Sequence, residues 1–268
     1  MIDASVDQQN ARFWDELCGT TFARRLGITD HSAEALRRFD DAYFVHYPYL
    51  LRRVPVQTMR GSKVLEVGLG YGSLGQRIAE SAAHYVGLDV AEGPVRMMNA
   101  RLKMSSLRGS ATRGSMLRCP FPDESFDILV SIGCFHHTGN LQRCIDETWR
   151  VLRPGGRAYL MVYGRYSYFR WLKWFKPTLR SLIVGEQEAS ESERLAYDSD
   201  LAGKAAPETV FVSRAALRRM LGHFSTVSLA LENATHLGFR GRTIVPRRYL
   251  LSTVGRLAGL DIYVDATK

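Results

Sequence analysis

Short apolar segments alternate with helical segments along residues 63–163, and this alternation constrains the fold more than any other feature of the sequence. VLEVG and YVGLDV are apolar, β-branched runs that end in Gly or Asp, and a helical pattern follows each of them. The pattern repeats through SFDILVSIGC at 125–134, LQRCIDETWRVL at 141–152 and RAYLMVY at 157–163. Strands that alternate with helices form a parallel sheet covered on both faces, so we predict an α/β, doubly wound core.

Two segments depart from this alternation. Residues 1–60 carry apolar residues at three- and four-residue intervals, broken at Pro48 and Pro55, and predict a helical N-terminal cap or lid. Residues 61–268 are predicted to form the core, with an insertion at about 165–210 that begins aromatic and basic and continues acidic. After the insertion, Ser213 is expected to cap a helix, and TVSLALEN and GLDIYVDATK are further candidate strands.

Composition excludes several classes of protein. The chain has 46% hydrophobic and 24% charged residues, no apolar run long enough to span a bilayer and no signal-peptide pattern at its start. The net charge of +9 comes mostly from Arg spread along the chain, which favours a solubilising surface over a nucleic-acid patch. The four cysteines are Cys18, Cys119, Cys134 and Cys144, and they show no Cys-x-x-Cys spacing. We therefore expect neither a disulfide framework nor a metal site, and we expect a cytoplasmic setting.

A glycine-rich turn follows the first predicted strand in VLEVGLGYG. Gly68, Gly70 and Gly72 let the backbone approach a ligand closely and leave amide groups free at the start of the next helix. A dinucleotide-binding fingerprint needs its third glycine at position 73, where this chain has Ser73. The spacing therefore disfavours a pyrophosphate ligand.

Two carboxylates at strand ends indicate the charge and the shape of the ligand. Glu66 would repel a pyrophosphate in the ligand crevice and attract an ammonium or sulfonium group. Asp89 ends the second strand, where a carboxylate is expected to accept hydrogen bonds from the two hydroxyls of a ribose. We therefore predict a ligand that carries a sugar and a positive centre.

The chain resembles the class I S-adenosylmethionine-dependent methyltransferases, in particular the bacterial group that includes the ubiquinone and menaquinone methyltransferases. The resemblance rests on EVGLGYG, Asp89, GSMLRCPFPDESFDILVSIGCFHHT and RVLRPGGRAYL, in the family's order over residues 60–163. It implies a Rossmann-like sheet of seven strands, with GLDIYVDATK as an antiparallel last strand and the insertion after strand five. It also implies S-adenosylmethionine as cofactor, S-adenosylhomocysteine as product, and no metal.

The resemblance also implies cofactor contacts. The glycines would approach the methionine part with Glu66 near its ammonium, Asp89 would hold the ribose, and Val90 would lie against the adenine. Many relatives carry Asp at position 115, so Ser115 implies that adenine recognition here rests more on backbone groups. The implied cofactor-binding set is Glu66, Gly68, Gly70, Gly72, Asp89, Val90, Ser115 and Met116 at the adenine edge, and Ser131 and Ile132 below the sulfonium.

Methyl transfer from a sulfonium requires mainly that a nucleophile is aligned, water is excluded and, for a hydroxyl, a proton is accepted. His136 and His137 follow the fourth strand, where substrate meets cofactor in such sheets, and are candidate bases or supports of the loop. His46 in the cap is a second candidate base. The candidate substrate contacts are Tyr43, Tyr47 and Tyr163.

The predicted function is S-adenosylmethionine-dependent methyl transfer to a hydroxyl or amine of a small or medium-sized metabolite, such as a glycan, a lipid-linked sugar or a natural product. The alternatives are C-methylation of a quinone-like ring, RNA methylation, and a catalytically inactive S-adenosylmethionine-binding interaction protein. No nucleic-acid partner is expected, because residues 131–134 lack the Asn/Asp-Pro-Pro-Tyr pattern of base-amine methylation. Residues 165–183 suit either a peripheral membrane contact or a capping helix with buried aromatic rings, and the sequence leaves the oligomeric state open.

Overall fold

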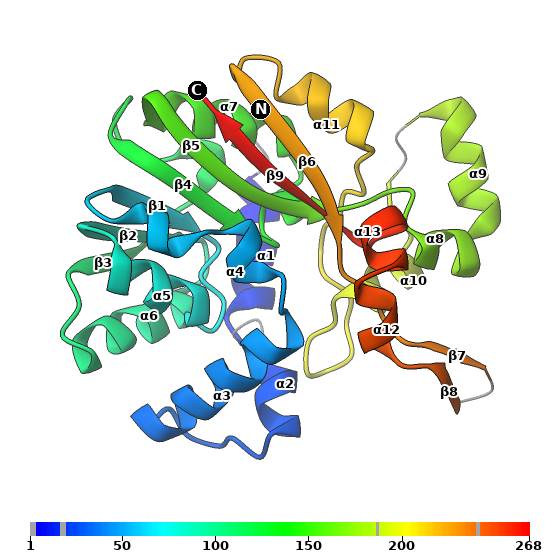
Figure 1. The fold of residues 1–268 in the computed structure, drawn as a ribbon, viewed down its shortest axis with the longest axis horizontal. Coiled ribbons are helices and arrows are strands. Elements are labelled where there is room, and N and C mark those ends of the chain that lie inside the picture. The colour runs from blue at the N-terminus through cyan, green and yellow to red at the C-terminus, as the bar shows by residue number, and fades with distance from the viewer. Residues whose placement is uncertain (1–3, 17–19, 186–187, 240–241) are drawn as a thin grey trace.

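The computed structural model describes residues 4–16, 20–185, 188–239 and 242–268, so Cys18 lies outside the described residues. A seven-stranded sheet, in the order β3-β2-β1-β4-β5-β9-β6, forms the centre of the molecule (Figure 1). Strands β1 to β5 pair in parallel, and β9 pairs antiparallel to both β5 and β6. The predicted α/β sheet of seven strands with an antiparallel last strand is confirmed.

The strand order places the sheet's elements as the alternation predicts. The strands are β1 (Lys63–Val67), β2 (His84–Asp89), β3 (Gly109–Arg113), β4 (Phe126–Ile132), β5 (Leu152–Tyr163), β6 (Thr226–Glu232) and β9 (Asp261–Thr267). The helices that cover them are α5 (Ser73–Ser81), α6 (Glu92–Met104), α7 (Leu141–Val151) and α11 (Arg214–Met220). Ser213 caps α11 as predicted, because its hydroxyl accepts a hydrogen bond from the Ala216 amide at 3.1 Å.

Residues 153–156, with the sequence Arg-Pro-Gly-Gly, lie within an irregular start of β5. Leu152 pairs with Phe126, and the register then shifts so that Arg157 pairs with Ile128. The intervening residues bulge from the sheet, which is why the sequence reads as a turn although the strand begins at Leu152.

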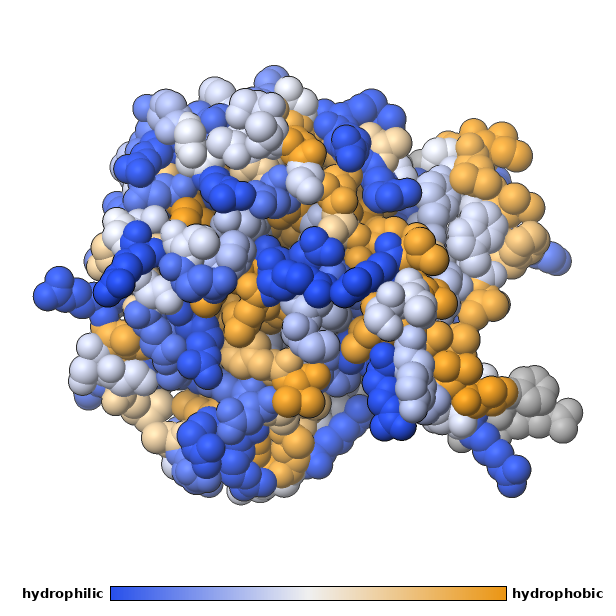
Figure 2. Space-filling view, viewed as in Figure 1, coloured by the Kyte–Doolittle hydropathy of each residue, from blue (hydrophilic) through white to orange (hydrophobic). Residues whose placement is uncertain are grey.

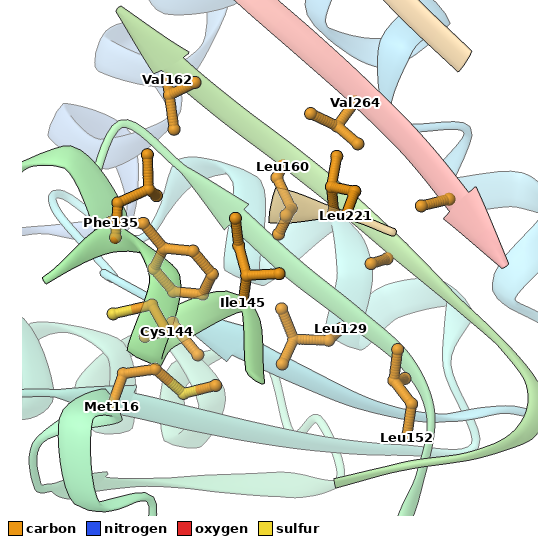
Figure 3. Close-up of a cluster of buried hydrophobic side chains, with 14 of the residues drawn as sticks. Met116, Leu129, Phe135, Cys144, Ile145, Leu152, Leu160, Val162, Leu221 and Val264 are labelled. Atoms are coloured by element: carbon orange, nitrogen blue, oxygen red, sulfur yellow. The ribbon is translucent and has the colours of Figure 1, made fainter. Parts of the chain in front are cut away.

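Both faces of the sheet are buried, since successive side chains of a strand point to opposite faces. In β4, Leu129 packs with α7 and α11 on one face, where Figure 3 shows it among Ile145, Leu160 and Leu221. Its neighbour Val130 packs on the other face, with residues of α5 and α6.

Three groups of elements surround the sheet. The N-terminal group has α1 (Ala4–Trp14), α2 (Thr20–Arg25), α3 (Ala33–His46) and α4 (Leu50–Arg53). The segment after β5 has α8 (Tyr168–Lys173), α9 (Phe175–Val184) and α10 (Glu191–Tyr197). Between β6 and β9 lie β7 (Leu237–Phe239), β8 (Arg242–Val245), α12 (Arg247–Leu251) and α13 (Val254–Ala258), which the sequence analysis did not predict. None of the described helices combines the length and apolar character needed to cross a membrane.

A buried ion pair attaches α3 to the core. The guanidinium of Arg101 on α6 donates two hydrogen bonds of 2.9 Å to the carboxylate of Asp40 on α3. The same guanidinium donates to the carbonyl of Tyr71 at 2.8 Å, and Ser73 donates its hydroxyl proton to Asp40 at 2.6 Å. The pair therefore ties the cap to the turn between β1 and α5.

We predict that Arg101→Leu lowers the free energy of unfolding by about 3–5 kcal/mol, because it leaves the Asp40 carboxylate buried without a counter-charge. Asp40→Leu combined with Arg101→Leu should be less destabilising than Arg101→Leu alone. Denaturant unfolding measures both variants, with Arg37→Ala as a control because its ion pairs are exposed. A double variant that is less stable than Arg101→Leu would contradict this account.

Candidate active site

A cavity of about 630 Å³ opens at the carboxyl ends of β1, β2, β4 and β5. Its walls come from the glycine-rich turn, the N-terminal helices, the segment after β5 and the segment between β6 and β9. Carboxyl ends of parallel strands are the usual ligand position in open α/β sheets. This cleft is the candidate active site.

The glycine-rich turn has a backbone that side chains would not allow. Gly68, Gly70 and Gly72 have φ angles of 82°, 52° and 78°. A Cβ atom on Gly68 would lie 2.5 Å from the Cβ of Cys134, so the turn also needs glycine there for space. The backbone of the turn therefore forms part of the cleft wall directly.

Asp89 holds this turn against the end of β2. One of its carboxylate oxygens accepts a hydrogen bond from the Leu69 amide at 2.8 Å, and the other accepts from the Ala91 amide at 2.9 Å. Burial nevertheless raises the pKa of Asp89 to about 6. Each oxygen keeps a further lone pair, so the carboxylate can position the turn and still accept from a ligand hydroxyl.

Glu66 is the second buried carboxyl group beside the turn. It accepts a hydrogen bond from the Tyr85 hydroxyl, and burial raises the pKa of Glu66 to about 8. An ammonium or sulfonium nearby would favour its ionised form. The turn and its two carboxylates thus suit the charge and the ribose predicted for the ligand.

His137 faces the cleft with one ring nitrogen. Its Nδ1 donates to the Glu208 carbonyl at 2.7 Å, which leaves Nε2 as the unprotonated nitrogen of the neutral ring. Nε2 lies 3.6 Å from a carboxylate oxygen of Asp198, and the Tyr163 hydroxyl donates to the other oxygen at 3.3 Å. Burial raises the pKa of Asp198. A basic nitrogen, a carboxylate and a phenol therefore meet at one point of the wall.

His136 lies behind this wall and does not line the cleft. It is fully buried, its ring packs 4.0 Å from that of Tyr163, and neither ring nitrogen has a hydrogen-bond partner among the described residues. Burial lowers the pKa of His136 well below its usual range. The neutral His136 ring packs against the rings of Tyr163 and His137 from behind the cleft wall.

His46 lines the cleft from the cap, together with the predicted substrate contacts Tyr43 and Tyr47. Burial, and then the charges of Arg247 and Arg25, lower the pKa of His46 to about 4. Its ring stands 4.6 Å from that of Tyr47. His46 is therefore neutral at physiological pH and forms part of an aromatic wall.

Most of the predicted site residues line this single cleft. Ser131 is an exception: it is buried in the sheet and donates to the Val67 carbonyl at 3.0 Å. Besides His136 and Ser131, every predicted residue lines the cavity: Glu66, Gly68, Gly70, Gly72, Asp89, Val90, Ser115, Met116, Ile132, His137, His46, Tyr43, Tyr47 and Tyr163.

Five Asp or Glu residues that line the cleft were missed by the sequence analysis, among them Asp198 and Asp261. Asp198 follows α10 in the insertion, and Asp261 begins β9. Asp261 is buried, burial raises its pKa to about 7, and one of its oxygens has no hydrogen-bond partner among the described residues. The only sequence signal was a charged residue at the start of an otherwise apolar strand. No group of described His, Cys, Asp or Glu residues is arranged to hold a metal ion.

The known proteins that this chain resembles include several methyltransferases. Residues 65–160 match the family described as a methyltransferase domain. The chain is 29% identical to a demethylmenaquinone methyltransferase of Tropheryma whipplei over 49% of this chain and 56% of that protein. It is 32% identical to a sterol 24-C-methyltransferase of Gibberella zeae over 48% and 33% of the two chains. The chain thus matches about half or less of the length of these curated relatives.

A solved structure extends the likeness in fold beyond this region. A SAM-dependent methyltransferase of Thermotoga maritima aligns with a TM-score of 0.53 at 16% identity, over 85% of this chain and 94% of that one. The predicted family resemblance and Rossmann-like fold are confirmed.

We predict that Gly68→Ala weakens binding of S-adenosylmethionine about ten- to a hundredfold, because a Cβ would displace the turn or Cys134. Isothermal titration calorimetry measures the affinity. Gly61→Ala is the matched control, since Gly61 has a φ of 80° and a Cβ added there would meet nothing within 4 Å. Equal losses of affinity in both variants would contradict the assignment of the turn to ligand binding.

We also predict that the ligand-free protein becomes less stable between about pH 6.5 and pH 8. The raised pKa values of Glu66 and Asp261, about 8 and about 7, mean that the folded chain binds more protons than the unfolded chain in this range. Each group then lowers the free energy of unfolding by up to about 1.4 kcal/mol per pH unit. Below this range the lowered pKa values of His46 and His136 have the opposite effect, because they make the free energy of unfolding fall as the pH falls.

Urea unfolding at the two pH values measures this effect. Glu66→Gln combined with Asp261→Asn should flatten the dependence. A wild-type protein that gains stability as the pH rises through this range would show that the two carboxyls are not held protonated.

Proposed function

Since residues 65–160 belong to the methyltransferase-domain family and the fold is that of the class I S-adenosylmethionine-dependent enzymes, we propose that this chain methylates a hydroxyl or amine of a small or medium-sized metabolite. The acceptor class includes glycans, lipid-linked sugars and natural products. One observation carries the proposal: His137 Nε2 faces Asp198 inside the cleft that also contains the glycine-rich turn.

The residues of the turn suit S-adenosylmethionine, whose sulfonium supplies a transferable methyl group. The turn offers backbone where a Cβ would fill the space, and Glu66 offers a carboxyl group for the ammonium. Asp89 offers its carboxylate to the ribose, and Val90, Ser115 and Met116 line the same cleft for the adenine. Ile132 and Tyr163 end β4 and β5 and line the same cleft, and the Tyr163 ring centroid lies 5.8 Å from that of His137.

His137 would act as the general base. The Nδ1 proton is held by the Glu208 carbonyl, so the lone pair of Nε2 is available to an acceptor hydroxyl. Nε2 would accept the proton of the acceptor hydroxyl, and S-adenosylmethionine, when bound, would supply the methyl group and a thioether leaving group. Asp198 would stabilise the resulting imidazolium, since it lies 3.6 Å from Nε2.

The carboxylates of the cleft favour an acceptor with several hydrogen-bond donors. Asp198 and Asp261 each have an oxygen without a hydrogen bond among the described residues, and a buried carboxylate without hydrogen bonds is costly; the Asp198 oxygen is the one that lies 3.6 Å from His137 Nε2. Hydroxyls or an amine of the acceptor would satisfy them, with Tyr43 and Tyr47 closing the cleft from the cap. An apolar ring alone would leave both unpaired.

C-methylation of a quinone-like ring is the second candidate. The name of the Tropheryma whipplei relative favours it, and the aromatic side chains of the cleft could pack against a flat ring. We further propose a cytoplasmic setting, because Cys119 and Cys144 are buried thiols that form no disulfide.

We predict that His137→Gln and Asp198→Asn each lower turnover about 10²- to 10⁴-fold, as removal of a general base or its partner does, with little change in cofactor affinity. Transfer of a labelled methyl group to a panel of amino sugars, glycosides and hydroquinones measures turnover, and calorimetry measures cofactor affinity. His223→Gln is the control, since His223 is exposed on the surface.

The outcomes separate the candidates. Transfer to glycosides or amines that is lost in both variants supports the proposal. Transfer only to hydroquinone carbon supports the second candidate. Cofactor binding without transfer to any acceptor would instead favour an inactive binding protein, and full turnover by His137→Gln would remove this residue from the mechanism.

A further inference from the structure

Helix α9 buries polar side chains and exposes apolar ones. Its buried residues are Thr178 and Ser181, whereas Leu179, Leu182 and Ile183 are 44%, 55% and 86% exposed. An amphipathic helix of a globular protein normally turns its apolar side chains to the core. Because α9 turns its hydroxyls inward, its apolar side is exposed, and exposed apolar patches are typical of surfaces that contact a partner or a membrane.

Helices α12 and α13, which pack against α8, also expose apolar side chains. Tyr168 and Phe169 of α8 pack in one cluster with Leu250 of α12 and Val254 of α13. These two helices in turn expose Tyr249 and Leu257, the latter to 80%. Figure 2 shows apolar side chains over α9 and over α12, on the same side of the molecule. We call the exposed side of α8, α9, α12 and α13 the α9 face.

The charge of the α9 face has one sign. Lys173, Lys176 and Arg180 are exposed beside the leucines, and Arg248 and Arg256 are exposed on α12 and α13. Residues 168–184 and 247–258 contain no Asp or Glu. Exposed apolar side chains mixed with cations are typical of helices that lie in the interface of an anionic membrane.

We infer that the α9 face docks on the surface of an anionic lipid bilayer. The cations would meet the lipid headgroups, while Phe175, Leu179, Leu182 and Ile183 enter the boundary of the acyl chains. A second copy of the chain is less suited to this face, because two such surfaces would bring like charges together. Docking of this kind is peripheral, since no described helix is long and apolar enough to cross the membrane.

The docking face and the cleft share one helix. Phe169 of α8 lines the cleft, and its ring centroid lies 5.7 Å from that of Trp174, which directly precedes α9. A docked chain would therefore present this side of the cleft toward the lipid. An amphiphilic acceptor could then reach the cleft from the bilayer, an extension that rests on the proposed methyl transfer.

Vesicle sedimentation tests the docking without any measure of methyl transfer. The purified chain is mixed at low salt with vesicles of phosphatidylcholine alone or of phosphatidylcholine with phosphatidylglycerol. We expect at least about tenfold stronger binding to the anionic vesicles, weakened by salt. Binding that is equal on both kinds of vesicle, or absent from both, would overturn the inference.

Two sets of substitutions locate the contact. Leu179→Gln, Leu182→Gln and Ile183→Gln together should abolish binding without loss of folding, because these side chains are exposed and Gln is a good helix former. Met104→Gln is the matched control, since Met104 is 47% exposed on α6 and outside the α9 face.

In the second set, Lys173→Gln, Lys176→Gln and Arg180→Gln together should remove the preference for anionic lipid. Unchanged vesicle binding by both triple variants would overturn the assignment to this face. Analytical ultracentrifugation tests whether a second copy of the chain covers the α9 face. A wild-type dimer that dissociates in the variant with Gln at positions 179, 182 and 183 would show that it does, and would overturn the inference of membrane docking.

Discussion

The hydrogen bonds of Asp89 to the amides of Leu69 and Ala91 are the interaction on which the site depends. They hold the glycine-rich turn against the end of β2, where the backbone approaches Cys134 too closely for any side chain on Gly68. The Asp40–Arg101 pair then fixes the cap to the same turn through Tyr71 and Ser73. The side of the cleft formed by the turn is therefore held to the core by buried polar contacts.

The acceptor side is built differently. Its carboxylates come from segments that are far apart in sequence, Asp198 after α10 and Asp261 at the start of β9, and each keeps an oxygen without a hydrogen bond among the described residues. Burial raises the pKa of each carboxyl group, which is a cost to the folded chain. Such a cost is common where a site is arranged for a ligand that supplies the missing donors. The segment after β5 also contains helix α9, whose apolar side chains are exposed. Part of the proposed acceptor side of the cleft and part of the proposed membrane contact therefore come from this one segment.

The sequence identified the sheet because its signals are local. Apolar runs, their Gly and Asp ends and the intervening helical patterns each depend on residues close in the chain, and the family's motifs lie in these same segments. The glycines, Glu66 and Asp89 were found for this reason. The two neighbouring histidines could not be told apart, because His137 faces the cleft and His136 the wall behind it only once the short helix Phe135–His137 is formed. Ser131 was misplaced for a similar reason: its side chain points into the sheet toward Val67.

The sequence by itself determined the class of fold and the residues of the glycine-rich turn, since strand ends and a glycine turn bring those groups together through backbone geometry alone. Only the tertiary structure decided which further groups line the cleft beside the turn. Asp198, Asp261 and His137 meet because three segments with no common periodicity pack over the end of the sheet. It also decided which side of α9 is exposed, because the burial of Thr178 and Ser181 depends on the surface against which the helix packs and not on its own pattern of residues.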